Sequence, residues 1–227
     1  MIADIYTFER VEKKYLITEE KAKSLIEKLS DVLIPDAHGK NTVKSLYLDT
    51  PSYLLIRNSI EAKTYKEKLR LRSYGEMKEG NSVFFEIKKK YKGVVYKRRV
   101  VMTYNEAMEY IKTKIPPQES QIMREIDYAM KIYEGIRPSV LISCEREAYF
   151  FRDLPALRLT FDRNVRYLKY GTTEEKQITG CGDVLMELKC GGAIPVWLSR
   201  ILDECKIYPM RFSKYGKAYL DILAKEK

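Results

Sequence analysis

Charged and apolar residues alternate along several segments of the chain, with the period of two that is typical of β-strands. The clearest segment is residues 68–72, Lys-Leu-Arg-Leu-Arg, which puts leucines on one face and cations on the other. Similar alternation places Glu12 with Lys14, and Lys97 with Arg99, on one face of a strand. Repeated strands of this kind predict a sheet that closes around a charged lumen. Because unpaired cations repel one another strongly away from water, such a lumen favours a polyanion as its ligand.

Hydrophobic periodicity and turn residues predict the elements between these segments. Thr18 is typical of a helix N-cap and Gly135 of a helix C-cap, while residues 35–39 are expected to form a loop. Predicted strands cover 5–17, 43–49, 65–74, 83–89, 94–102, 139–150, 156–168 and 183–190, and predicted helices cover 19–33, 104–113, 118–134, 197–207 and 213–223. This order indicates an α+β fold in a single domain over residues 1–227. We expect an antiparallel eight-stranded β-tunnel with helices packed outside it.

Composition fits a soluble globular protein, since 45% of the 227 residues are hydrophobic and 33% are charged. No apolar run approaches the roughly 18–20 residues of a membrane span. The first ten residues lack the features of a signal peptide. The four cysteines have no metal-ligand spacing, so we expect reduced thiols, and His38, the one histidine, is expected in a loop. We therefore expect a cytoplasmic protein, which could lie peripherally at a membrane only through a separate membrane protein partner.

The net charge of +10 indicates acidic partners: nucleic acid, anionic lipid or phosphorylated small molecules. The 18 tyrosines keep nucleic acid among the candidates, because aromatic side chains stack on bases. However, a closed tunnel admits a phosphate chain and excludes a duplex. Nucleic acid is therefore the least favoured of these partners.

Ordered motifs along nearly the whole chain add a family resemblance. Residues 10–15, Arg-Val-Glu-Lys-Lys-Tyr, stand where the triphosphate tunnel metalloenzymes (the CYTH-like superfamily) carry a Glu-x-Glu-x-Lys signature. Further matches follow at 45–50, 69–75, 84–88, 97–99, 145–149, 159–162, 185–189 and 212–215. Each match alone is weak, but the ordered set identifies the chain as a member of this superfamily. With Arg10 in the first Glu position, it resembles the VTC (vacuolar transporter chaperone) domain polyphosphate polymerases.

This resemblance implies a metal-dependent phosphotransferase that moves the γ-phosphate of ATP onto a growing polyphosphate chain. ATP and inorganic polyphosphate or triphosphate would be its ligands, and Mn²⁺ its expected metal, with Mg²⁺ as the alternative. Carried over by motif, the catalytic residues would be Lys14, Arg70, Arg72, Lys88, Arg146 and Glu187, the further phosphate ligands Lys97, Arg99, Arg158, Lys189, Lys214 and Arg10, and the metal ligands Glu187 and Glu12.

The residue types suit this chemistry. Phosphoryl transfer depends mainly on positioning and charge neutralisation, and the guanidinium fork of arginine matches phosphate oxygens. A hard cation prefers carboxylate oxygens, which makes Glu187 conspicuous as a nearly solitary carboxylate among cations, although a salt bridge would also explain it. Glu86 and Glu145 are interpreted as partners that orient cations, Asp49 and Asp162 as positioning residues, and Trp197 as a packing residue.

Two other functions remain as alternatives. A tunnel triphosphatase would hydrolyse inorganic or nucleoside triphosphate, but such enzymes use several glutamates to hold metals and activate water. A non-catalytic sensor would bind polyphosphate or nucleotide without turnover. Arg10 in place of a glutamate favours chain binding over water activation. The sequence does not single out adenine-binding residues among the tyrosines, nor the polymer length, its exit direction or the oligomeric state.

Overall fold

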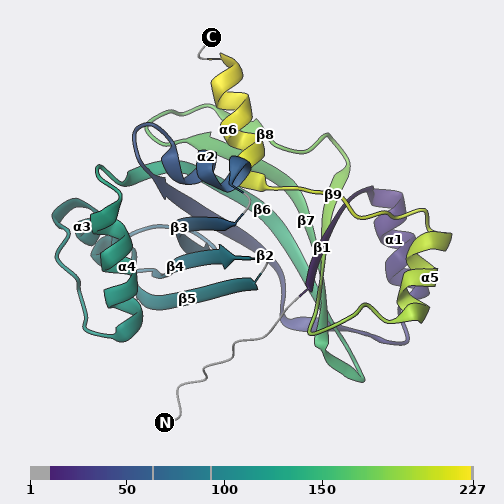
Figure 1. The fold of residues 1–227 in the computed structure, drawn as a ribbon. Helices are drawn as coiled ribbons and strands as arrows, with labels where there is room; N and C mark the ends of the chain where they lie inside the picture. The colour runs from purple at the N-terminus through teal and green to yellow at the C-terminus, as the bar shows by residue number, and fades with distance from the viewer. Residues whose placement is uncertain (1–10, 63, 93, 226–227) are drawn as a thin grey trace.

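The computed structural model describes residues 11–62, 64–92 and 94–225, which form one large sheet flanked by helices (Figure 1). In this part of the chain the strands are β1 (Val11–Thr18), β2 (Leu33–Asp49), β3 (Tyr65–Tyr74), β4 (Ser82–Tyr91), β5 (Val94–Thr103), β6 (Arg137–Phe151), β7 (Leu154–Lys169), β8 (Glu175–Gln177) and β9 (Asp183–Cys190). The helices are α1 (Glu19–Lys28), α2 (Leu54–Glu61), α3 (Tyr104–Thr113), α4 (Gln121–Ile132), α5 (Val196–Glu204) and α6 (Lys214–Lys225).

All the strand pairs are antiparallel, so the predicted α+β class and antiparallel sheet are confirmed. Eight strands follow the order β1-β9-β7-β6-β2-β3-β4-β5, and β8 is added beside β7. The expected closure by hydrogen bonds is wrong for the described residues, because β1 and β5 remain the two edges. The free edge of β1 instead receives the segment before α6, where the Met210 N–H donates to the Lys14 carbonyl at 2.7 Å.

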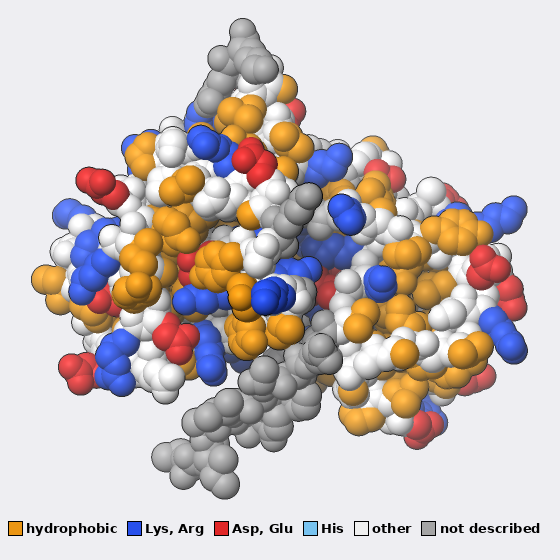
Figure 2. All heavy atoms as spheres, viewed as in Figure 1, with side chains coloured by type: hydrophobic (Ala, Val, Ile, Leu, Met, Phe, Trp, Pro, Cys, Tyr) orange, Lys and Arg blue, Asp and Glu red, His pale blue; other side chains and the backbone are white. Residues whose placement is uncertain are grey.

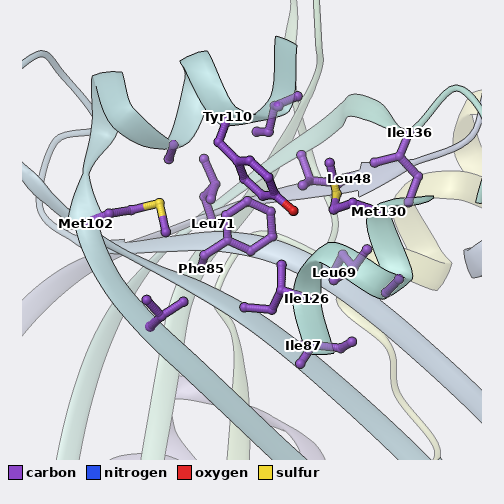
Figure 3. Packing of buried hydrophobic residues seen from close by; sticks show 14 of the residues in the cluster. Leu48, Leu69, Leu71, Phe85, Ile87, Met102, Tyr110, Ile126, Met130 and Ile136 are labelled. Atoms are coloured by element: carbon purple, nitrogen blue, oxygen red, sulfur yellow. The ribbon is translucent and has the colours of Figure 1, made fainter. Parts of the chain in front are cut away.

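Helices cover the outer face of the curved sheet at two places. On one side, α3 and α4 pack over β3, β4 and β5, and the Tyr110 ring meets the Phe85 ring at a centroid distance of 5.6 Å (Figure 3). On the other side, α1 and α5 pack over β1, β7 and β9 around Leu25, Phe161 and Leu198. Both clusters use the apolar alternate residues of the strands, so the remaining alternate residues are left on the inner face.

A third apolar cluster lies on the inner face itself, where α6 packs against β2 and β6. Tyr215 of α6 stacks on Tyr47 of β2 at 4.4 Å between ring centroids, and Val140 and Ile142 of β6 belong to the same cluster. Tyr47 lies opposite Arg70 in the β2–β3 register, which places it on the face that carries the charges. Helix α6 therefore fills part of the concave face and begins beside the charged part.

Several helices and strands differ from those that the sequence predicted. The expected loop at 35–39 is part of β2, whose pairing with β6 is interrupted between Pro35 and Lys40, a bulge that accommodates a proline in a strand. Helix α2 and the short strand β8 were not predicted. Residues 5–10 of the expected first strand lie outside the described residues. Thr18 does cap α1, because its side chain accepts a hydrogen bond from the Lys21 N–H.

The four cysteines are free thiols. None of the helices in the described ranges combines the length and the apolar character that a membrane crossing requires.

Asp49 explains why α2 forms directly after β2. Its carboxylate accepts hydrogen bonds from the N–H groups of Leu55 at 2.8 Å and Ile56 at 3.0 Å, and from the Tyr215 hydroxyl at 2.8 Å. The side chain is completely buried. We expect Asp49→Ala to lower the free energy of unfolding by roughly 2 kcal/mol, since buried donors lose their acceptor. Urea unfolding would measure this loss, and an unchanged midpoint would contradict the capping role.

Candidate functional site

The register of the sheet brings the charged residues of different strands onto one face. Lys14 of β1 lies opposite Glu187 of β9, Arg146 of β6 opposite Asp162 of β7, and Glu86 of β4 opposite Arg99 of β5. Residues that lie opposite each other in a sheet share a face. Figure 2 shows a hollow near the middle of the molecule, with Lys or Arg side chains deep inside it and acidic side chains beside them. We call this concave surface the lumen.

The lumen holds more cations than carboxylates among the described residues. Its cations are Lys14, Lys68, Arg70, Arg72, Lys88, Lys97, Arg99, Arg146, Arg158, Lys189 and Lys214, and its carboxylates are Glu12, Glu86, Asp162 and Glu187. The interpretation of Glu187 as nearly solitary is therefore wrong. Lys68 was not predicted for the site, although its alternation with Arg70 pointed to it. Arg10 lies outside the described residues.

Glu86 holds two lumen cations in place. Its buried carboxylate accepts a hydrogen bond from Arg70 Nε at 2.8 Å and lies 2.6 Å from Lys97 Nζ. Burial by itself would raise the pKa of Glu86, but the charges of Arg70 and Lys97 bring it down to about 2. Glu86 is thus ionised at neutral pH, and it fixes the direction of two cations without being open to a ligand.

Asp162 holds a second pair in the same way. Arg146 donates to its two oxygens through Nε and Nη2, each at 2.6 Å, and Lys214 Nζ also donates to this carboxylate. Burial opposes ionisation, but Lys214 and Arg146 bring the pKa of Asp162 down to about 2. Lys214 opens α6, so this ion pair also ties the start of the helix to the lumen. The interpretation of Asp162 as a positioning residue agrees with these contacts.

Glu187 and Glu12 lie on either side of one lysine. Lys14 Nζ is 3.5 Å from Glu12 Oε1 and 3.6 Å from Glu187 Oε1. Glu187 also lies 3.2 Å from Lys189 Nζ and 3.7 Å from Arg146 Nη2. Burial would raise the pKa of Glu187, yet these surrounding cations hold it well below its ordinary value. The two carboxylates therefore converge on a position that already favours positive charge.

Glu187 and Glu12 are the carboxylates that could hold a metal ion together. In the described residues, no group of three or more His, Cys, Asp or Glu side chains could hold a metal ion. Two carboxylates that converge on one ammonium group do suit a cation that takes its other ligands from phosphate oxygens and water, as Mg²⁺ commonly does. The donor set therefore fits a metal bound together with a phosphate substrate rather than one held by protein alone.

Side-chain contacts link separate parts of the sheet across the lumen. Lys88 Nζ of β4 lies 3.8 Å from Glu12 Oε2 of β1, so an ion pair joins one edge strand to the strand next to the other edge. Lys68 Nζ donates to Ser213 Oγ at 3.1 Å, just before α6 begins. Arg158 of β7 pairs with Asp36 at 2.5 Å, a partner that sequence reasoning missed. Side-chain contacts thus enclose the lumen at places where no hydrogen-bonded strands enclose it.

Arg72 differs from the other described lumen cations because it is buried without an anionic partner. Only 9% of its surface is exposed, its Nε has no hydrogen-bond acceptor, and it forms no ion pair with any described residue. Burial, followed by the charges of Arg70 and Arg146, lowers the pKa of Arg72 from its ordinary value. A buried guanidinium without an acceptor is costly for the folded protein. The arrangement leaves Arg72 available for an anion that enters from solvent.

The remaining charged residues of the motifs point outward. Arg98 lies 3.8 Å from Glu125 of α4, whereas its neighbours Lys97 and Arg99 share the lumen face with Glu86 and Lys88. Glu145 is exposed and accepts a hydrogen bond from Asn164 at 2.9 Å. Trp197 of α5 packs against Phe151 at a ring distance of 6.0 Å. The alternation rule therefore separates lumen residues from outer ones within each motif.

Comparison with known proteins gives a family and a fold. The family model of the VTC domain matches residues 9–222. No curated protein matches the sequence at a significant level. Among solved structures, a candidate adenylate cyclase from Bacillus halodurans superposes with a TM-score of 0.57 at 16% identity, over 90% of this chain and 93% of that one.

Two other solved structures are similar. A candidate adenylate cyclase from Vibrio parahaemolyticus has a TM-score of 0.55 at 11% identity, over 94% of this chain and 98% of that one. A Hippeastrum protein, whose structural report states a dominant triphosphatase activity, has a TM-score of 0.55 at 16% identity, over 91% and 93%. At these identities the likeness establishes a shared fold, which is the tunnel fold expected from the motifs.

Proposed function

Because the chain belongs to the VTC domain family, we propose that it is an ATP-dependent polyphosphate polymerase. In this proposal the lumen binds the triphosphate of ATP and the end of a growing phosphate chain. The observation that carries the proposal is Arg72, a buried guanidinium that lacks an anionic partner among the described residues. Phosphate oxygens match the fork of an arginine, and an extended phosphate chain would satisfy several lumen cations at once.

The reaction requires little covalent chemistry from the protein. A terminal oxygen of the phosphate chain attacks the γ-phosphorus, the bond from that phosphorus to the β,γ-bridging oxygen breaks, and ADP leaves. Arg70 and Arg146 would hold the transferring phosphate, since Glu86 and Asp162 fix their guanidinium groups in place. Fixed cations stabilise the transition state without reorganisation, which is the main source of acceleration in phosphoryl transfer.

The other lumen cations would bind either the γ-phosphate or the remaining phosphates of the two substrates. We assign Arg72 and Lys88 to the γ-phosphate together with Arg70 and Arg146, and Lys14 to the same reacting end. Lys97, Arg99, Arg158, Lys189 and Lys214 would bind the rest of the phosphate chain or of the triphosphate. Arg10, outside the described residues, retains only its motif-based assignment.

A divalent metal, Mn²⁺ or Mg²⁺, would be held by Glu187 and Glu12 together with phosphate oxygens. When bound, it supplies charge neutralisation to the triphosphate. Lys14, which lies between the two carboxylates, would then turn toward the phosphates. The lumen's own residues perform the rest: they orient the phosphates and balance their charge.

The carboxylate pattern favours transfer to phosphate over transfer to water. Of the four lumen carboxylates, Glu86 and Asp162 are saturated by close cations, so neither is available as a base for water. The triphosphatase alternative draws on the activity stated for the Hippeastrum protein. A non-catalytic sensor would use the same cations for binding alone.

The three functions give different products. The purified protein would be incubated with ATP and Mn²⁺, followed by a polyphosphate-stained gel and a free-phosphate assay on the same sample. We expect stained polymer and little orthophosphate. Orthophosphate without polymer would support the triphosphatase, and neither product would support the sensor, so both outcomes would overturn the proposal.

The binding of ATP in the lumen should weaken as the pH rises. Burial lowers the pKa of Lys68 to about 8, and burial likewise lowers the pKa of Lys97 to about 8 although Glu86 opposes the change. Both side chains therefore lose charge as the pH rises through about 8, while the phosphates of ATP stay ionised. We expect the affinity for ATP, measured calorimetrically without metal, to fall between about pH 7.5 and 9.5.

A double variant serves as the control for this profile. Lys68→Met with Lys97→Met should bind ATP more weakly at the lower pH and show a flatter pH dependence. An equally steep profile in the double variant, or a flat profile in the wild type, would contradict the assignment.

A further inference from the structure

An aromatic and apolar surface continues the lumen beyond Arg72. Tyr74 follows Arg72 on the same face of β3, Phe84 of β4 lies opposite Arg72, and Val101 of β5 lies opposite Phe84. Tyr74 is 55% exposed and Val101 53% exposed, whereas Arg72 is buried. The lumen face therefore changes at this level from buried charge to solvent-exposed apolar side chains.

These side chains contact one another and the adjacent cations. The rings of Tyr74 and Phe84 meet edge to face, 6.0 Å apart at 83°. The guanidinium of Arg72 lies 5.5 Å from the Tyr74 ring centre, and that of Arg99 lies 4.6 Å from the Phe84 ring centre. Each of these two lumen arginines thus lies against an aromatic ring. An exposed ring beside a cation, as Tyr74 is beside Arg72, is a combination that binds nucleobases by stacking.

We propose that Tyr74, Phe84 and Val101 form a nucleobase platform that binds the base of the nucleoside triphosphate. The inference rests on the proposed function, because it takes the triphosphate to lie on the lumen cations. Successive same-face residues on a strand are separated by about 7 Å. Tyr74 is thus one same-face position beyond Arg72 and two beyond Arg70. This spacing leaves room for the ribose between the base and the phosphates that the lumen cations bind.

The chemistry of the platform indicates its selectivity. Stacking on rings and contact with a valine are possible for any base, and a larger purine covers more of this surface than a pyrimidine. The platform therefore favours a purine nucleotide over inorganic triphosphate. It also gives the triphosphate one orientation, with the nucleoside end toward Tyr74 and the γ-phosphate toward Arg70, Arg146 and the carboxylate pair.

The test compares ATP with inorganic tripolyphosphate by calorimetric titration of the full chain. Tyr74→Ala should weaken ATP binding about tenfold, because one stacking partner is lost. Binding of tripolyphosphate, which has no base, should be unchanged. Tyr74→Phe, which keeps the ring, should bind ATP like the wild type. Tyr128→Ala on α4 is the matched control, since Tyr128 is 63% exposed and lies outside the lumen.

Four other binding results would overturn the platform. Equal losses for ATP and tripolyphosphate would mean that Tyr74 only positions Arg72. Unchanged ATP binding, the same loss in Tyr128→Ala, or a wild type that binds ATP no better than tripolyphosphate would exclude a base contact. If the platform results hold but no polymer forms from ATP, the polymerase proposal fails while the nucleotide site stands.

Discussion

Arg72→Met is expected to make the folded protein more stable while it removes function. We expect polymer formation from ATP to fall at least about a hundredfold, as for the loss of one fixed donor to a transition-state charge. In the absence of ligand, the free energy of unfolding should rise by about 1 kcal/mol. Gel assays of polymer and urea unfolding of the same preparation would measure the two effects.

The opposite signs follow from the environment of Arg72. In the free protein its charge is buried near Arg70 and Arg146, and its Nε has no acceptor. Methionine fills a similar volume without a charge, so the repulsion and the unsatisfied donor both disappear. When phosphate is bound, the same guanidinium becomes a charge-assisted donor. A residue that costs stability in the free state and contributes only when ligand is bound is typical of a functional site.

Arg98→Met is the matched control, since Arg98 lies on the outer face of β5 beside Glu125. It removes one cation from the same chain but should leave polymer formation and tripolyphosphate affinity unchanged. If Arg72→Met instead unfolds more easily than the wild type, Arg72 has a structural partner, and its assignment to the substrate is wrong.

Glu187→Gln is expected to have the second largest effect, again with two parts. Removing the carboxylate takes one anionic partner from Lys189, Lys14 and Arg146, of which Lys14 keeps Glu12 and Arg146 keeps Asp162. The free energy of unfolding should therefore fall by about 3 kcal/mol, as when one partner of a buried pair is removed. Tripolyphosphate affinity in metal-free buffer should increase, because these three cations lose a competing anion.

The metal-dependent activity separates the two interpretations of Glu187. If Glu187 holds a metal with the substrate, polymer formation in Mn²⁺ should fall about a hundredfold even at temperatures where the variant is folded. Glu145→Gln, on the outer face of β6, should change neither activity nor affinity. Full activity of Glu187→Gln under these conditions would show that the residue is only a salt-bridge partner.

The alternation of charged and apolar residues predicted most of the lumen. A period of two fixes which side chains share a face, so Lys97 and Arg99 could be separated from Arg98 before their neighbours were known. The same rule places Tyr74, two residues after Arg72, on the lumen face, but the sequence did not single it out among the tyrosines or show that its ring would be exposed. Helix α3 was also predicted correctly from the helical spacing of its apolar residues, and the structure adds a local capping box formed by Thr103 and Glu106.

Other features depend on contacts between distant segments. The partner of Arg158 is Asp36, 122 residues away, and it lies in a bulge that the sequence did not distinguish from a loop. Arg70 and Arg72 are equivalent in the sequence, but only Arg70 lies opposite Glu86, so the register decides which arginine is left without an anion. Likewise, the sequence did not show that the segment before α6 would pack along the edge of β1.

The fate of the γ-phosphate tests the central claim most directly. Two parallel reactions would contain ATP labelled at the γ- or the α-phosphate, and the label would be followed on a polyphosphate gel while ADP is quantified. The account predicts that the γ-label enters the polymer, with one ADP formed for each phosphate incorporated, and that the α-label remains in nucleotide. Recovery of the γ-label as orthophosphate, with no labelled polymer, would contradict it.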